Sequence, residues 1–175
     1  MPNQVEEIVH DLLDAWNSRD LSRFLSFLTE DVEWYDMGML HPPASGRDAV
    51  KEFCEAVLRA FPDFKFTVQS PICVAPDGSR CAVLWKIDAT HSGLFDPPGF
   101  APTGRHASFE GVDILDFRGL RICRILTLFD VVKVGSQFLG IRLRPDPGSF
   151  RERCIVRAQC VLAAWLRRRP LRRAA

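Results

Sequence analysis

Residues 85–141 read WKIDATHSGLFDPPGFAPTGRHASFEGVDILDFRGLRICRILTLFDVVKVGSQFLGI and decide the fold of this chain. Apolar and polar residues alternate over 81–91, 105–118 and 121–133, which predicts three strands of one antiparallel sheet. Acidic residues interrupt the apolar runs of these strands. A carboxylate between apolar walls is costly unless it is paired or protonated. Burial also tunes a carboxyl group for proton transfer near neutral pH, so the pattern points to acid–base chemistry.

The residues before this stretch predict helices and two further strands. Apolar residues at helical spacing indicate three helices, and shorter apolar runs indicate the strands. The expected elements are helices over 5–17, 21–28 and 46–61 and strands over 32–39 and 64–74. This order predicts an α+β fold, a curved antiparallel sheet wrapped around a long N-terminal helix to give a cone-shaped α+β barrel. We place this domain in residues 1–141.

Composition excludes several classes of protein. The chain of 175 residues is 47% hydrophobic and 26% charged, as expected for one globular domain. Its six cysteines show neither C-x-x-C nor zinc spacing with histidine, so we expect no metal. We expect neither a signal peptide nor a membrane span, and therefore a cytoplasmic protein with reduced thiols.

The charge is uneven along the chain. The net charge is +1, but from Arg142 onward ten arginines stand against two acidic residues, which gives this segment +8 and the first 141 residues −7. We expect residues 142–175 to be a basic extension with one amphipathic helix, capped by Ser149 and Glu152. We expect its apolar stripe, which includes Trp165, to dock on the acidic body. An acidic partner or a membrane surface is the alternative, and we expect no nucleic acid as partner.

Strand periodicity gathers three aspartates, because side chains two residues apart share a face. Asp36, Asp88 and Asp113 each lie on the face of their strand that we interpret as the more apolar one. If those faces converge, they enclose an apolar cavity with carboxyl groups, a lysine, a hydroxyl and an indole. The residues that we expect to line it are Trp34, Leu84, Lys86, Phe109, Leu115, Thr127 and Phe129.

Each aspartate could instead have a purely structural, non-catalytic role. Asp36 could simply begin a turn, and Asp88 could pair with Lys86 or Arg105 on a solvated face, where such pairs contribute little. Asp113 has the weakest alternative, because its neighbours at even spacing are apolar or glycine. We therefore expect Asp113 to be buried and functional.

His91 completes the set of candidate catalytic residues with Asp36, Asp88 and Asp113. It stands where a strand enters the long loop 93–104, and it could carry a proton or serve as a plain hydrogen-bonding group. The Gly and Pro residues of that loop suit a lid with limited freedom.

Several motifs in the same order give the chain a family resemblance. They are T-H-S-G, P-T-G-R, F-E-G-V-D-I, F-D and Q-F-L-G, preceded by L-L-D-A-W-N-S-R-D-L-S-R-F, L-T-E-D-V-E-W-Y-D and G-R-D-A-V-K-E-F. Over residues 4–141 the chain resembles the SnoaL-like polyketide cyclase family, within the superfamily of ketosteroid isomerase and nuclear transport factor 2. The resemblance implies the fold given above and a homodimer that pairs through the outer face of the sheet. It implies no single reaction, since the superfamily hosts many chemistries and non-enzymes.

The resemblance also suggests roles for single residues. Asp36 falls where ketosteroid isomerases keep their general base, and Asp113 falls where they keep a protonated Asp that donates to the developing oxyanion. The tyrosine of that oxyanion site would lie near Leu12 and is missing. In the polyketide cyclases the acid/base Asp would be at Thr127 and its His partner at Asp113, so both differ here.

No enzyme of the superfamily is matched completely. Limonene-epoxide hydrolases would place their Arg-x-Asp pair at Lys86 and Asp88, but their second Asp also falls on Thr127. We expect an isomerase, cyclase or hydratase that acts on a small hydrophobic polyketide- or terpenoid-like substrate without a metal or organic cofactor. Asp36 and Asp113 would be its base and oxyanion donor. Epoxide opening at Asp88, or a non-catalytic hydrophobic-ligand carrier or dimerisation module, are the alternatives.

Overall fold

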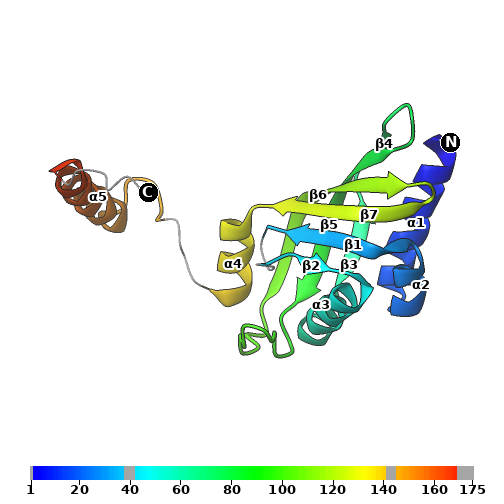
Figure 1. Ribbon diagram of the computed structural model, residues 1–175. Coiled ribbons are helices and arrows are strands. Elements are labelled where there is room, and N and C mark those ends of the chain that lie inside the picture. Colours follow the sequence, from blue (N-terminus) through cyan, green and yellow to red (C-terminus); the bar gives the residue numbers. More distant parts are fainter. Residues whose placement is uncertain (1, 38–41, 141–144, 169–175) are drawn as a thin grey trace. The chain divides into compact units, whose positions relative to one another are not determined.

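The sequence folds as two units, residues 1–141 and residues 142–175, which we describe separately. The computed structural model describes residues 2–37, 42–140 and 145–168. In the first unit, helices pack beside one seven-stranded sheet (Figure 1). The predicted α+β class is confirmed.

Three helices precede most of the sheet: α1 (Pro2–Asn17), α2 (Leu21–Ser26) and α3 (Arg47–Ala60). One face of α1 is buried because its apolar residues recur every three or four positions. Asp20 caps α2 by accepting a hydrogen bond from the backbone N–H of Arg23 at 2.9 Å. The expected extension of this helix to Leu28 is wrong, because Leu28 opens the first strand and is fully buried there.

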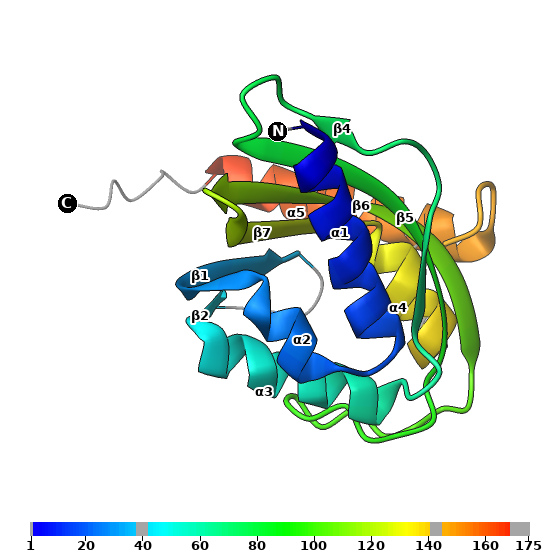
Figure 2. The same ribbon diagram turned by 90° about the vertical axis from the view of Figure 1, so that its right-hand side faces the viewer.

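The strands form one open, curved sheet in the order β2-β1-β7-β6-β5-β3, with β4 paired to β5. They are β1 (Leu28–Asp36), β2 (Ala44–Ser45), β3 (Lys65–Val68), β4 (Cys73–Val74), β5 (Arg80–Thr90), β6 (His106–Arg118) and β7 (Arg121–Phe129). Figure 2, seen from the side of α1, shows β5 and β6 curving past this helix. The end of the strand that we expected over 32–39 lies outside the described residues.

The sheet is not purely antiparallel as predicted. β1 pairs with β7 in parallel, with Asp36 opposite Thr127, whereas the other pairs of strands are antiparallel. A parallel pair needs a long connection, and here more than half of the unit lies between the two strands. Local alternation in the sequence carries no signal for such a distant pairing.

A helix that the sequence interpretation missed follows β7. We expected a strand over 121–133, but β7 ends at Phe129 and α4 covers Val131–Leu139. The side chain of Asp130 accepts a hydrogen bond from the backbone N–H of Lys133 at 2.9 Å and so caps α4. Gly140 ends the helix with φ of 69°, a left-handed conformation that glycine adopts without steric cost.

Trp16 stands at the centre of the core between the first helix and the sheet. Its ring contacts Phe24, Phe64, Phe66 and Trp34 at centroid distances of 5.4, 5.5, 5.8 and 6.3 Å. Full burial of one such side chain stabilises the fold by about 1.5–3 kcal/mol. Aromatic rings of α1 and α2 therefore pack against rings of β1 and β3 on this face of the sheet.

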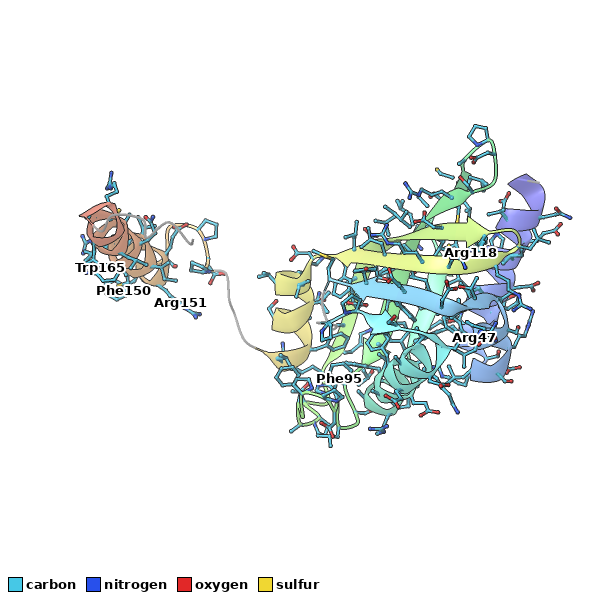
Figure 3. All side chains as sticks on the ribbon, in the orientation of Figure 1. Arg47, Phe95, Arg118, Phe150, Arg151 and Trp165 are labelled. Carbon is cyan, nitrogen blue, oxygen red and sulfur yellow. The ribbon has the colours of Figure 1, made fainter. Side chains whose placement is uncertain are left out.

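Two arginines labelled in Figure 3 contact residues of β1. Arg47 of α3 donates to the carbonyl of Leu28 at 3.1 Å and pairs with Glu30 at 2.6 Å. Arg118 of β6 pairs with Asp31 at 3.0 Å. The exposed pair of Arg118 and Asp31 contributes little to stability. The half-buried guanidinium of Arg47, in contrast, provides a hydrogen-bond donor for a strand carbonyl.

The second unit contains the helix α5 (Phe150–Arg168). Ser149 Oγ accepts from the N–H of Glu152 at 3.1 Å, and the Glu152 carboxylate accepts from the N–H of Gly148 at 2.6 Å. The predicted cap at Ser149 and Glu152 is confirmed. In the described part of the chain, no helix combines the length and the apolar character that crossing a membrane requires.

Candidate active site

Asp36, Thr127 and Asp113 form one row across three neighbouring strands. Asp36 of β1 pairs with Thr127 of β7, and Thr127 pairs with Asp113 of β6. Directly paired residues point to the same face, and neighbouring strands lie about 4.8 Å apart. The two aspartates are therefore roughly 10 Å apart at the backbone. Their side chains leave the concave face side by side, with one hydroxyl between them.

This row is buried and shielded from solvent. Asp36, Thr127 and Asp113 are 6%, 6% and 9% exposed. Burial disfavours the charged form of a carboxyl group and raises the pKa of Asp113 to about 7. The hydroxyl of Thr127 and the indole of Trp85 oppose this shift, and the neighbouring Asp36 adds to it. Asp113 is thus half protonated near neutral pH.

Thr127 is held by an indole on β1. Nε1 of Trp34 donates a hydrogen bond to Oγ1 of Thr127 at 3.0 Å. Because one lone pair of that oxygen is occupied, the hydroxyl proton is available to the carboxyl of Asp113, whose pKa it lowers. The position that the resemblance gives to a cyclase carboxylate therefore holds a fixed, non-titrating hydroxyl.

Apolar side chains surround the row as the sequence predicts. Trp34, Phe109 and Leu115 are buried on the same face, and Phe129 is half-buried beside them. The rings of Phe109 and Phe129 lie 5.6 Å apart. Charge interactions are strong in such surroundings, because little water is present to screen them.

The structure contradicts the expectation that Asp88, Lys86 and Leu84 face this site. On β5 the buried residues alternate with these three, and Leu84 is 49% exposed. Asp88 lies 3.4 Å from Lys86 and 3.8 Å from His106. A hydrogen bond from Ser108 is the main cause that lowers the pKa of Asp88. Both faces of this strand carry apolar residues, and the sequence interpretation chose the outer one.

His91 is buried but lies far from the two aspartates. Its ring packs on Phe61 at 5.1 Å and on Phe138 at 6.4 Å, and burial lowers its pKa. Val83, which pairs with Asp113, precedes His91 by eight residues along the chain, or roughly 26 Å of strand. The structure therefore does not bring His91 to the row. Its Nδ1 lies 3.4 Å from Oγ1 of Thr103, whereas its Nε2 has no hydrogen-bond partner among the described residues.

Both ends of the loop 93–104 are fastened to helices. The N–H of Gly93 donates to the carbonyl of Ala60 at 3.0 Å, and Oγ1 of Thr103 donates to that of Phe138 at 2.6 Å. A Cβ at Gly93 would lie 2.0 Å from the carbonyl oxygen of Arg59, so this close approach needs glycine.

Trp85 is a residue of the site that the sequence interpretation missed. It lies on the buried face of β5, directly across from Gly111 of β6. The signal was present, because Val83, Trp85 and Ile87 are a purely apolar set at spacing two. Among the described residues, no group of three or more His, Cys, Asp or Glu side chains could hold a metal ion.

Comparisons with known proteins agree with this architecture. AclR of Streptomyces galilaeus, proposed to be a hydroxylase, shares 25% identity over 95% of this chain and 96% of its own, with a TM-score of 0.68. A proposed polyketide cyclase from Pseudomonas putida KT2440 shares 19% over 77% and 97%, with a TM-score of 0.66. A protein of ketosteroid isomerase-like fold from Catenulispora acidiphila DSM 44928 shares 15% over 80% and 98%, with a TM-score of 0.64.

No curated protein matches the chain. The family of SnoaL-like domains, in contrast, matches residues 9–125, about two thirds of the sequence and most of the first unit. The matched range includes Asp36 and Asp113 and the strands that carry them. This chain therefore belongs to the SnoaL-like domain family.

Proposed function

We propose that this protein is an acid–base enzyme, an isomerase, cyclase or hydratase, that acts on a small hydrophobic polyketide- or terpenoid-like carbonyl compound. One observation carries the proposal: two buried carboxyl groups share one row of the sheet, and burial raises the pKa of Asp113 to about 7. In such a pair one carboxylate can act as the base while the other carboxyl group, kept protonated, acts as the acid or donor.

In this scheme Asp36 is the base and Asp113 the hydrogen-bond donor. The carboxylate of Asp36 removes a proton from the carbon next to the substrate carbonyl, and the electron pair of that C–H bond moves to the carbonyl oxygen. The protonated carboxyl of Asp113 donates a hydrogen bond to the oxygen as it gains charge. The enolate then takes the proton back at another carbon or attacks a second carbonyl. Base catalysis supplies roughly 10²–10⁴-fold and one oxyanion donor roughly 10²–10³-fold.

The family and its neighbours support a cyclase-type reaction of this kind, which requires no cofactor. Epoxide opening at Asp88 has no support, because Asp88 lies on the other face of the sheet. Hydrophobic-ligand carriage without catalysis is the second candidate. It is favoured by the hydroxyl at Thr127 and by Leu12, which is buried at 4% exposure and offers no donor.

Turnover of a panel of small polyketide- and terpenoid-like carbonyl compounds tests the proposal. We expect Asp36→Asn and Asp113→Asn each to lower kcat/KM by roughly 10²–10⁴-fold. Asp88→Asn is the matched control, a carboxyl on the outer face of the same sheet, and should leave turnover unchanged. Full turnover in both Asp36→Asn and Asp113→Asn would refute the assignment. Binding of panel compounds without any product would favour the carrier.

We also propose a homodimer that pairs through the outer face of the sheet. Two apolar rows cross β5, β6 and β7 there: Leu84, Val112 and Leu128, and beside them Ile114 and Leu126. Leu84 is 49% exposed and the other four are half-buried. An apolar area of this kind favours association. Light scattering should give twice the chain mass for the unchanged protein and the mass of a single chain for Leu84→Glu. A monomeric unchanged protein would contradict the proposal.

A further inference from the structure

The indole N–H of Trp85 has no role in the scheme above, and its surroundings indicate one. Trp85 is 1% exposed, and its Nε1 has no hydrogen-bond partner among the described residues. A buried donor of this kind is uncommon, because it has given up water without a replacement. Oδ1 of Asp113 is likewise buried and without a partner there.

The two unsatisfied groups are neighbours. Trp85 pairs with Gly111 and Val83 pairs with Asp113, so the indole and the carboxyl leave the same face of adjacent strands. The indole lies close enough to favour the ionised form of Asp113, yet its N–H makes no well-formed hydrogen bond among the described residues. One oxygen atom placed between them would satisfy both.

The ring of Trp85 is also fixed in place. A Cβ at Gly111 would lie 2.2 Å from Cη2 and 2.5 Å from Cζ2 of Trp85, so the ring occupies space that any other residue would fill. Phe66, Phe109 and Phe129 contact the same ring at 5.5, 6.0 and 6.4 Å. A donor held this firmly needs little reorganisation when it binds a ligand.

We propose that the N–H of Trp85 and the carboxyl of Asp113 together bind one oxygen of the substrate, so that the site holds two hydrogen-bond donors. This inference rests on the proposed function and deepens it. It names the substrate class as an apolar carbonyl, enol or phenol compound with one oxygen directed at β5 and β6. The indole of Trp85 would also be the second hydrogen-bond donor of the oxyanion site, a role that Leu12 cannot fill.

Binding of 2-naphthol, an apolar ring system with one oxygen, tests the inference. Its fluorescence gives a Kd for the full chain at pH 6. We expect Trp85→Phe, which keeps a ring but removes the N–H, to weaken binding roughly tenfold. Trp16→Phe is the matched control, because the Nε1 of Trp16 is equally buried and without a partner in the described chain but belongs to α1.

Three results would overturn the inference: unchanged affinity in Trp85→Phe, an equal loss in Trp16→Phe, or no binding of 2-naphthol to the unchanged protein. If Trp85 acted only on the protonation of Asp113, Trp85→Phe would raise the pKa of Asp113. At pH 6, below that pKa, the Kd would then stay unchanged, which is the first of these results. The proposed function fails by a different result, full turnover in Asp36→Asn and Asp113→Asn, so the two failures are distinguishable.

Discussion

Replacing Asp113 by Asn should make the protein more stable at alkaline pH while it removes activity. The pKa of Asp113 rises from 3.8 to about 7 because the side chain is buried. A raised carboxyl pKa means that the folded state holds its proton more tightly than the unfolded state. The resulting stability is present at low pH and is lost as pH rises from 3.8 to 7. Each pKa unit corresponds to about 1.4 kcal/mol. Burying this side chain therefore costs about 4 kcal/mol at pH 8, where it is mostly ionised, and about 2 kcal/mol at pH 5, where folding must protonate it.

Asn has the same shape and no charge, so Asp113→Asn should recover much of that cost. Urea unfolding followed by tryptophan fluorescence at pH 5 and pH 8 gives the free energy of unfolding of each variant. We expect the advantage of Asp113→Asn over the unchanged protein to grow by about 2 kcal/mol between the two pH values. Asp88→Asn, at a carboxyl whose pKa is lowered, should show no such gain. An advantage of Asp113→Asn that is independent of pH would refute the reasoning.

Three further predictions concern other parts of the chain. Thr127→Val leaves the indole N–H of Trp34 without its acceptor and should cost about 1–3 kcal/mol of unfolding free energy, while the pKa of Asp113, followed by NMR, should rise. An unchanged urea midpoint would argue against that hydrogen bond. Asp130→Ala removes the cap of α4 and should cost about 1 kcal/mol in the same assay, whereas a neutral effect would contradict the capping role. Deleting residues 145–175 tests the docking that the sequence predicts for its basic helix: we expect lower solubility, and an equally soluble protein of unchanged oligomeric mass would oppose docking.

The sequence predicts the site best where one face of a strand is clearly the more apolar one. On β6, Phe109, Asp113 and Leu115 lie at even spacing, and the opposite face mixes Val112 and Ile114 with Glu110 and Asp116. The face of Asp113 was therefore predictable. On β5 both faces carry apolar residues, so the alternation was assigned to the wrong face and Trp85 was missed.

Pairings between strands that are distant in the sequence could not be predicted from local sequence patterns. The parallel pairing of Asp36 with Thr127 joins residues at opposite ends of the first unit, and the periodicity of each strand is the same for either direction. The helix after Phe129 was missed because Val131 and Val132 continue a run of β-branched residues. The signal that distinguishes it is Asp130, a good N-cap, followed ten residues later by Gly140 at the C-terminal end.

The pKa of Asp113 tests the central claim most directly. Carbon NMR of labelled aspartate carboxyl groups follows its titration in the intact protein and in Asp36→Asn. We predict a pKa of about 7 in the unchanged protein and a lower value in Asp36→Asn, because the charge of Asp36 contributes to the shift. A titration near the ordinary value of 3.8 would contradict the burial of a neutral carboxyl beside a charged one, and with it the division of roles between the two aspartates.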